Sequence, residues 1–255
     1  MKGKRAGLTA LLGLAFLLVA VEPAAAQTSS STTEQLIWGL NSKLIYVAVP
    51  ITILVEGILI YTVWKFSKSE SAQPTKENRR LEITWTIATA VILLFVGAAS
   101  YQVLGSPYVS AESNQQLDTA EEPMEVKVYG QRYNWEFHYP EQDINTTNTV
   151  VIPADRDVEL NITSRDWLHA VHVPGLGLKQ DAFPGQWNSI KTKASETGTY
   201  QLYCAEYCGS GHSKMLGSVE VKSQEDFQTW VDEQQSSGSS GGNGSTNGSN
   251  NSSSN

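Results

Sequence analysis

The feature that most constrains this chain is a pair of apolar runs near its N-terminus, over residues 44–64 and 83–104. As a helix, each run is about 30 Å long, which matches the hydrocarbon core of a bilayer. The connection between them, residues 65–80, holds five lysines and arginines, whereas residues 105–126 hold none. The positive-inside rule therefore predicts a two-helix transmembrane hairpin with a cytoplasmic loop and with the rest of the chain on the outer face.

Both ends of the chain read as segments outside the folded domains. Residues 1–26 have the order of a secretory signal peptide, with basic residues first, then an apolar run and then small residues; a retained membrane anchor is the alternative. Residues 236–255 contain only Ser, Gly, Asn and Thr, so no apolar side chain offsets the entropy of ordering them. We expect a disordered tail there, a transmembrane domain over 27–104 and an outer domain over 105–235.

The outer domain has the alternating pattern of β-forming residues that is typical of strands. Seven short strands are expected, at residues 125–139, 149–152, 157–164, 169–173, 187–191, 199–204 and 217–221. So many short strands in about 100 residues predict an all-β sandwich of Greek-key type. A closing helix should begin at Ser223, which forms a capping box with Asp226, and its apolar face should hold Phe227, Trp230 and Val231.

The net charge of −8 is unevenly distributed, because residues 105–255 hold 20 acidic and 9 basic side chains while residues 1–104 carry +3. Nucleic acid is excluded as a partner, since its binding requires a cationic surface. The acidity of the outer domain could steer a basic soluble partner or could keep the domain soluble in a salty medium.

Both cysteines of the chain lie in one short segment, Cys204-Ala-Glu-Tyr-Cys208-Gly-Ser-Gly-His212-Ser-Lys-Met215. A disulfide between the two cysteines is one interpretation, but it would require neither His212 nor Met215. Thiolate, imidazole and thioether ligands together favour copper, whereas zinc rarely binds methionine. This segment therefore predicts a copper site between the last two strands of the sandwich.

A mononuclear copper site of the blue type uses one cysteine, but this segment has two, which could bridge a pair of metal ions. A second histidine must then come from another strand. His169 and His172 are the candidates, and their spacing places them on opposite faces of a strand, so one of them is expected to bind. His138 reads as a surface or partly buried side chain.

The chain resembles subunit II of haem-copper terminal oxidases of the cytochrome c oxidase type, which carries a dinuclear CuA centre in a cupredoxin-like domain. The resemblance rests on Cys-x-Glu-x-Cys-x-x-x-His-x-x-Met and covers nearly all of residues 34–231. The family's upstream segment is matched by His169, Pro174, Gly177, Leu178, Asp181, Pro184 and Gly185. This register selects His169 rather than His172 as the ligand.

The resemblance also implies a role for each group of the segment. Cys204 and Cys208 would bridge two copper ions, and His169 and His212 would bind one ion each. Met215 and the main-chain carbonyl of Glu206 would be the weak ligands. The Glu206 side chain resembles a magnesium ligand at the interface with subunit I, the alternative being an exposed loop acid.

The resemblance also implies functions for three further positions. Glu82 matches the acid at the entrance of the K proton pathway, although a first-turn acid is also favoured by the helix dipole. The family's Gly-His-Gln-Trp-Tyr-Trp appears here as Gly-Gln-Arg-Tyr133-Asn-Trp135, so Tyr133 replaces the tryptophan that accepts electrons from cytochrome c. The donor could accordingly be a small copper protein, and Trp135 could be either an electron-accepting side chain or part of the sandwich core.

The implied function is that of an electron relay in the cell membrane. A soluble donor would reduce CuA, and the electron would pass to haem in subunit I, where oxygen is reduced and protons are pumped. The spans show no set of histidines to bind haem, so the oxygen chemistry would belong to other subunits. The alternatives are subunit II of a CuA-type nitric oxide reductase, a metal-free scaffold subunit of a quinol oxidase, and a membrane-tethered copper carrier.

Overall fold

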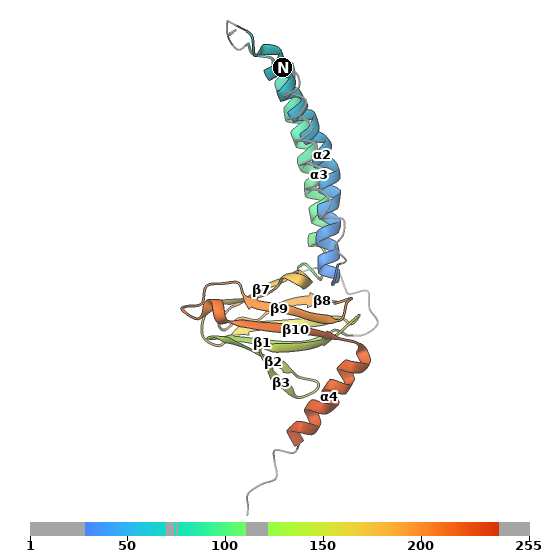
Figure 1. Ribbon diagram of the computed structural model, residues 1–255, viewed down its shortest axis with the longest axis vertical. Coiled ribbons are helices and arrows are strands. Elements are labelled where there is room, and N and C mark those ends of the chain that lie inside the picture. Colours follow the sequence, from blue (N-terminus) through green and yellow to red (C-terminus); the bar gives the residue numbers. More distant parts are fainter. Residues whose placement is uncertain (1–28, 70–73, 75, 111–121, 240–255) are drawn as a thin grey trace, which may run out of the picture.

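The computed structural model describes residues 29–69, 74, 76–110 and 122–239, which form a long helical hairpin standing on a β-sandwich (Figure 1). The expected signal peptide and most of the expected tail lie outside these residues. The elements in chain order are α2 (Thr32–Phe66), α3 (Arg79–Leu104), β1 (Met124–Gln131), β2 (Asn134–Tyr139), β3 (Ile144–Thr147), β4 (Thr149–Pro153), β5 (Val158–Ser164), β6 (His169–Val173), η2 (Pro174–Leu176), β7 (Leu178–Ala182), β8 (Asn188–Thr192), β9 (Gly198–Cys204), η3 (His212–Lys214), β10 (Leu216–Lys222) and α4 (Gln224–Ser239).

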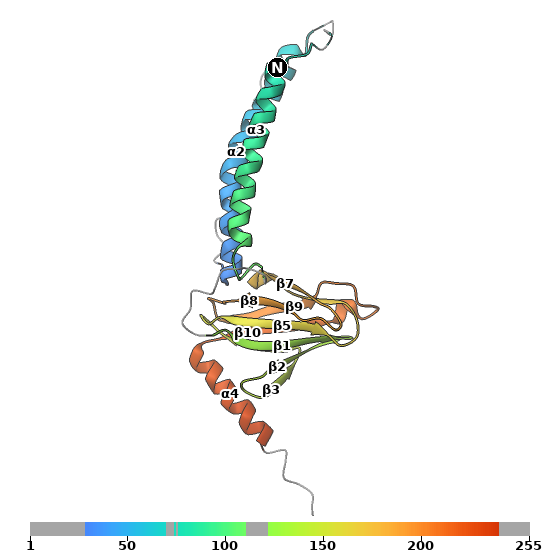
Figure 2. The ribbon, with the colours of Figure 1, turned by 180° about the vertical axis from the view of Figure 1, so that it is seen from behind.

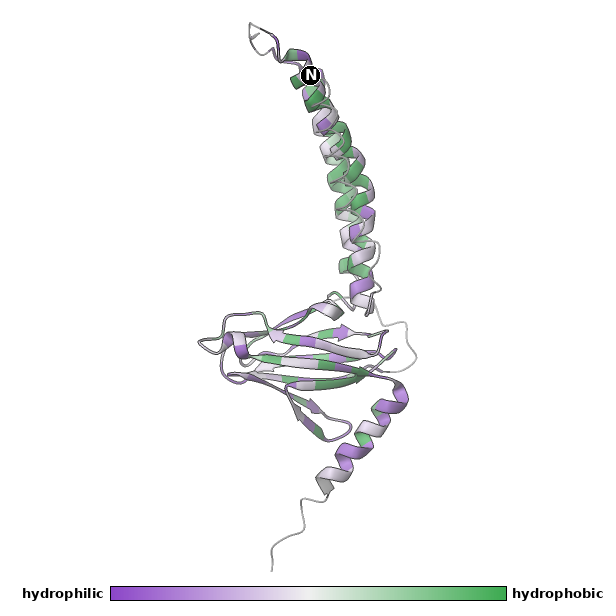
Figure 3. Cartoon of the chain, viewed as in Figure 1, coloured by the Kyte–Doolittle hydropathy of each residue, from purple (hydrophilic) through white to green (hydrophobic). Residues whose placement is uncertain are grey.

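Helices α2 and α3 run side by side in opposite directions, and both are long and apolar enough to cross a membrane (Figures 1 and 2). Polar side chains start each helix: Ser31 accepts a hydrogen bond from the Glu34 amide, and Asn78 accepts one from the Leu81 amide. The apolar residues concentrate along the middle of the hairpin, as Figure 3 shows. The two apolar runs of the sequence therefore form the helices that their length predicted.

The outer domain consists of two five-stranded sheets, in the orders β3-β2-β1-β5-β8 and β4-β10-β9-β6-β7. Both sheets are mixed, because β1 pairs with β5 and β4 pairs with β10 in parallel. Buried and half-buried residues alternate along β1 and β2, so one face of each strand enters the core. Two apolar helices followed by a β-sandwich is the fold class that the sequence predicted.

The sandwich differs from the expected one in three strands. The single strand expected over residues 125–139 is a hairpin of β1 and β2, which turns at Arg132 and Tyr133. Neither turn residue is glycine or proline, but the buried positions change from even numbers in β1 to odd numbers in β2, and this change of phase is the signal that the expectation of one strand missed. The short strands β3 and β7 were not expected, because their residues are largely polar and depend on pairing with β2 and β6.

Helix α4 closes the sandwich with the predicted cap and the predicted apolar face. The Ser223 hydroxyl accepts from the Asp226 amide at 3.1 Å, and Phe227 and Val231 are buried. The helix continues to Ser239, so the expected tail does not begin at Ser236. Hydroxyls that bond back to main-chain carbonyls support this last turn, as Ser237 does to Glu233 at 2.7 Å.

A cluster of polar contacts joins the hairpin to the sandwich. The Ser31 hydroxyl is fully buried and donates to the Leu176 carbonyl at 2.7 Å, while the Thr33 hydroxyl donates to the Tyr108 carbonyl at 3.2 Å. The Tyr108 hydroxyl in turn donates to the carboxylate of buried Asp157. The start of α2 and the residues after α3 are thus fixed to the same side of the sandwich, and we call this cluster the clamp.

Candidate metal centre

Pairing between strands brings two distant parts of the sequence to one end of the sandwich. His169 begins β6 and Cys204 ends β9, and these strands pair with Val171 opposite Cys204. The loop over residues 205–215, which we call the ligand loop, then joins β9 to β10 at the left of Figure 1. The Cys204 amide donates to the Met215 carbonyl at 3.0 Å, which ties the two ends of the loop together.

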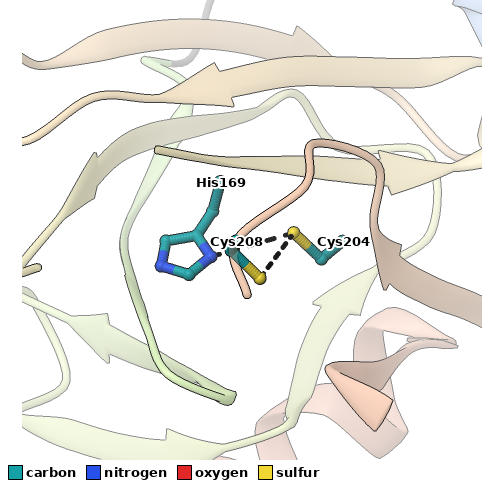
Figure 4. A group of neighbouring side chains, drawn as sticks. All are labelled: His169, Cys204 and Cys208. Atoms are coloured by element: carbon teal, nitrogen blue, oxygen red, sulfur yellow. Dashed lines mark hydrogen bonds between the residues drawn. The ribbon is translucent and has the colours of Figure 1, made fainter. Parts of the chain in front are cut away.

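The six predicted ligand groups converge on one volume. The side chains of His169, Cys204 and Cys208 point toward one another (Figure 4). The Cys204 sulfur lies 3.9 Å from the Cys208 sulfur and 3.8 Å from Nδ1 of His169. Ligand atoms of these three residues all lie within 4.8 Å of one another. The other contacts are Cys204 Sγ to the Glu206 carbonyl oxygen at 3.2 Å, Cys208 Sγ to His212 Nδ1 at 3.6 Å and Cys208 Sγ to Met215 Sδ at 3.9 Å.

Most of the donor set is shielded from solvent, while His212 is half-buried. His169, Cys208 and Met215 have no exposed surface, and Cys204 is 4% exposed. Both thiols are free, and their sulfurs are much farther apart than the ~2.05 Å of a disulfide bond. The disulfide interpretation therefore does not describe this structure.

The electrostatics of the two thiols favour a cation between them. Burial disfavours the Cys204 thiolate, but hydrogen bonds, first of all with His169, outweigh it and lower the pKa of Cys204. Burial and the neighbouring Cys204 charge raise the pKa of Cys208. Two thiolates so close together repel each other strongly unless a cation neutralises them. The pair of thiols, the two imidazoles and the thioether fit copper, a metal that soft ligands select.

Asp166 is a residue of the site that sequence reasoning missed. Its Oδ1 lies 2.9 Å from Nε2 of His169, so the carboxylate fixes the ring with Nδ1 directed at the sulfurs. Burial opposes the ionisation of Asp166, but bonds from His169 and from two main-chain amides lower its pKa. Its position three residues before His169 was the available signal, because the turn between β5 and β6 folds the two side chains together.

The two aromatic candidates for electron acceptance lie in different surroundings. Trp135 is fully buried and packs edge-on against His169, with ring centroids 6.0 Å apart, so it cannot touch a soluble partner. Tyr133 is half-buried and lies over the ligand loop, where a Cβ on Gly211 would meet its ring at 2.4 Å. Trp135 thus belongs to the core that supports His169, and Tyr133 packs on the loop.

The other sequence candidates are placed apart from the sulfurs. His172 is half-buried and packs against Tyr203 with the two rings tilted and their centroids 4.9 Å apart, while His138 lies beside Asn145. The Glu206 side chain is exposed although its carbonyl points to the site. Glu82 is exposed in the first turn of α3, at the end of the hairpin away from the sandwich (Figure 1).

Fold and site together define a membrane-anchored copper protein with a cupredoxin-like domain. Residues 22–103 match the family described as cytochrome c oxidase subunit II, transmembrane domain, and residues 141–222 match its periplasmic domain. The chain belongs to the cytochrome c oxidase subunit II family. It is therefore a membrane-bound subunit of a haem-copper oxidase, an oxidoreductase complex, and its sandwich is the copper-binding domain.

Relatives cover most of the chain. The probable cytochrome c oxidase subunit 2 of Rickettsia bellii is 30% identical over 74% of this chain and 75% of its own length. Cytochrome c oxidase subunit 2 of Cereibacter sphaeroides is 28% identical over 81% of this chain and 78% of its own length. A crystal structure of the periplasmic domain of subunit II of cytochrome oxidase from Bradyrhizobium japonicum is 25% identical, with a TM-score of 0.44, and covers 47% of this chain and 99% of that one.

Proposed function

We propose that this subunit receives electrons from a soluble donor through a dinuclear CuA centre and delivers them to haem in subunit I. The convergence of all six ligand groups around two sulfurs 3.9 Å apart carries the proposal. When bound, the copper pair supplies a one-electron carrier between donor and haem. Oxygen reduction and proton pumping then take place outside this chain.

The residues of the chain prepare the site before the metal binds. Cys204 and Cys208 would bridge the two copper ions, and His169 and His212 would each bind one. Met215 and the Glu206 carbonyl complete the set as weak ligands. Because most of the donor set is buried and the loop is tied at both ends, the site should change little between oxidation states, which would lower the reorganisation energy of electron transfer.

Copper loading of the purified full-length chain tests the centre. We expect two copper ions per chain and an electron paramagnetic resonance spectrum in which one unpaired electron couples to both nuclei. Cys208→Ser should abolish the shared-electron spectrum, while Ser210→Ala, on the same loop but outside the donor set, should retain it. A single copper ion with a mononuclear spectrum in the wild-type chain would refute the dinuclear centre.

The reaction of the complex is tested separately. Oxygen uptake by the purified complex, compared with nitric oxide turnover, distinguishes an oxidase from the nitric oxide reductase alternative. The convergence of the ligands weighs against the metal-free scaffold interpretation, since a scaffold subunit requires no cluster of soft ligands.

The exposed Glu206 carboxylate is proposed to bind magnesium where subunit I covers the ligand loop. The carbonyl of the same residue lies 3.2 Å from Cys204, so a single residue would connect the two metal sites. Glu206→Gln retains the carbonyl but weakens a hard oxygen ligand. We expect it to lose the bound metal, detected with Mn²⁺ as a paramagnetic substitute, while the copper spectrum is retained. Unchanged Mn²⁺ binding would contradict the assignment.

Glu82 is proposed as the entrance of the K proton pathway on the cytoplasmic side. Its support is its place on α3, at the end of the hairpin opposite the sandwich, next to the basic connection. With the basic connection in the cytoplasm, as the positive-inside rule favours, the sandwich would lie outside the plasma membrane. Glu82→Gln should slow turnover without changing copper reduction. Glu77→Gln, which changes an acid on the same connection outside the helix, should leave both turnover and copper reduction at the wild-type rate.

A further inference from the structure

A pair of side chains beside the metal site, Trp167 and Arg132, is not explained by packing. Trp167 is 53% exposed, on the turn between β5 and β6. The Arg132 guanidinium lies over its indole ring, 4.9 Å from the ring centroid. Arg132 forms none of the ion pairs found among the described residues. Its charge is therefore directed at a ring that faces solvent.

Two short routes connect this pair to the ligand groups. The Trp167 amide donates to Oδ1 of Asp166 at 2.7 Å, and the same oxygen lies 2.9 Å from Nε2 of His169. Along the second route, Nε of Arg132 donates to the Cys208 carbonyl at 3.1 Å. Hydrogen bonds thus lead from the main chain of Trp167 toward a histidine of the site, and from the guanidinium that lies over its indole toward a cysteine.

Tyr133 and Tyr207 are the other aromatic side chains beside the ligand loop. Tyr133 is accounted for by packing, because its ring occupies the space over Gly211. Tyr207 follows Glu206, on the part of the loop proposed to face subunit I, so a soluble donor would not reach it once the complex is assembled. Tyr207 is itself 71% exposed and packs on His212, with ring centroids 5.8 Å apart, so it is set aside by its proposed place under subunit I. Trp167 is the exposed aromatic side chain that lies outside that proposed contact.

We infer that the soluble donor contacts Trp167, and that Arg132 positions this indole; the inference rests on the proposed CuA function. The partner that docks at Trp167 and Arg132 is a small electron-transfer protein, which places the apolar edge of its redox group on the indole. One electron leaves the donor and reaches the copper pair, so the donor is oxidised and the pair is reduced by one electron. Bonds and protons are unchanged, and Trp167 itself is not oxidised.

Stopped-flow reduction of the copper-loaded complex tests this contact, with reduced cytochrome c and reduced plastocyanin as donors. Trp167→Ala should lower the second-order rate constant about tenfold or more, the effect of removing a central aromatic contact from an interface. Trp167→Phe should restore most of the loss. Tyr133→Leu, which retains bulk on the loop, should leave the rate constant near that of the wild type.

Trp187→Ala is the matched control, because Trp187 is 51% exposed but contacts Tyr129 instead of the pair. Hexaammineruthenium(II), a small reductant that does not dock, should reduce all variants equally, and their copper spectra should be alike. Binding of the oxidised donor to the metal-free complex, measured by surface plasmon resonance, should weaken for Trp167→Ala alone among these variants.

Several results would overturn the contact. They are a wild-type rate constant for Trp167→Ala, an equal loss for Trp187→Ala, or failure of both donors to reduce a centre that the small reductant does reduce. A wild-type complex without the shared-electron copper spectrum is a different result, because it removes the proposed function itself and this contact with it.

Discussion

At the scale of single residues, the orientation of His169 depends on Asp166. The carboxylate bonds to Nε2 and leaves Nδ1 facing the sulfurs, an arrangement that raises the basicity of a metal-binding imidazole. Burial lowers the pKa of His169, but its bonds to Cys204 and Asp166 outweigh burial and raise it. A residue that binds no metal itself therefore determines how well a ligand can bind one.

Replacing Asp166 tests this dependence. Asp166→Asn retains the size of the side chain but removes its charge, and we expect the copper affinity to fall by about 10- to 100-fold, as for other partners of metal-binding histidines. Competition with a chelator of known affinity measures the loss. Asp232→Asn on α4, remote from the site, should retain the wild-type affinity, and an unchanged affinity in Asp166→Asn would contradict the prediction.

The two thiols give a second residue-scale prediction, for the metal-free protein. Thiolate absorbance in the ultraviolet should rise in two steps as pH increases, one below and one above the ordinary range of a thiol. Cys204→Ser should remove the lower step and move the remaining step down, because the charge that opposes Cys208 is gone. A single step of double amplitude in the wild type would contradict the prediction.

The lowered pKa of Cys204 makes the stability of the metal-free fold depend on pH. A group whose pKa is lower in the folded state stabilises the fold above its unfolded pKa. That contribution is lost as pH falls through the lowered folded pKa. The metal-free fold should therefore be less stable when the pH lies below the lowered pKa of Cys204. Copper binding should also become weaker at such pH values, because protons compete for the thiolate.

The sequence predicts the metal ligands but not the residues that hold those ligands in place. The soft donors are recognisable because their side chains are rare in this chain and lie at close spacing. Asp166 and Arg132 are common residue types, and only the folded turns bring them to His169 and Cys208. Supporting residues of this kind are not predictable without the turn geometry.

At the scale of elements, the ligand loop and the β1–β2 hairpin shape each other. Tyr133 lies at the hairpin turn and its ring fills the space over Gly211. Gly209 has a φ of +124°, which strongly favours glycine. The loop can therefore approach the hairpin closely only with small residues at these positions.

Gly211→Ala tests this fit, because the added Cβ would lie 2.4 Å from the Tyr133 ring. We expect the free energy of unfolding of the metal-free protein to fall by about 1–3 kcal/mol, the usual cost of overpacking. Chemical denaturation measures the loss. In a Tyr133→Ala background the same substitution should cost much less, and equal costs in both backgrounds would show that the ring is not the obstacle.

Elements were predictable where local pattern alone determines them. The membrane helices follow from length and hydropathy, and α4 follows from its cap and its apolar face. Strands β3 and β7 are formed by pairing with neighbours across the sheets, which a local pattern does not contain. The turn after β1 was missed for a different reason: its two residues are neither glycine nor proline, and the change of phase in the buried positions across it was overlooked.

At the scale of the whole molecule, the clamp joins the membrane hairpin to the sandwich. Burial and the bond to Asp157 raise the pKa of Tyr108 well above its ordinary value, so this hydroxyl stays protonated and donates at all physiological pH values. Ser31 and Thr33 at the start of α2 add further bonds on the same side. The relation between the two parts thus rests on several independent contacts.

Tyr108→Phe tests the clamp, because it leaves the buried Asp157 carboxylate without this donor. We expect a loss of about 1–3 kcal/mol in the stability of the detergent-solubilised chain. Thermal unfolding measures it, and Tyr101→Phe, an exposed tyrosine on α3, is the control. In a double-mutant cycle with Asp157→Asn, the two losses should not add, and full additivity would show that the pair does not interact.

The clamp also fixes the position of the sandwich relative to the membrane-spanning hairpin. The probability that an electron tunnels falls exponentially with distance, so a domain that swung on a loose tether would deliver electrons in bursts, at whichever moments it came near. Because the clamp holds the hairpin both before α2 and after α3, it restricts such swinging, and in the proposed relay each electron would cross the same gap. A few hydroxyl groups outside the donor set would then keep the rate of electron transfer uniform.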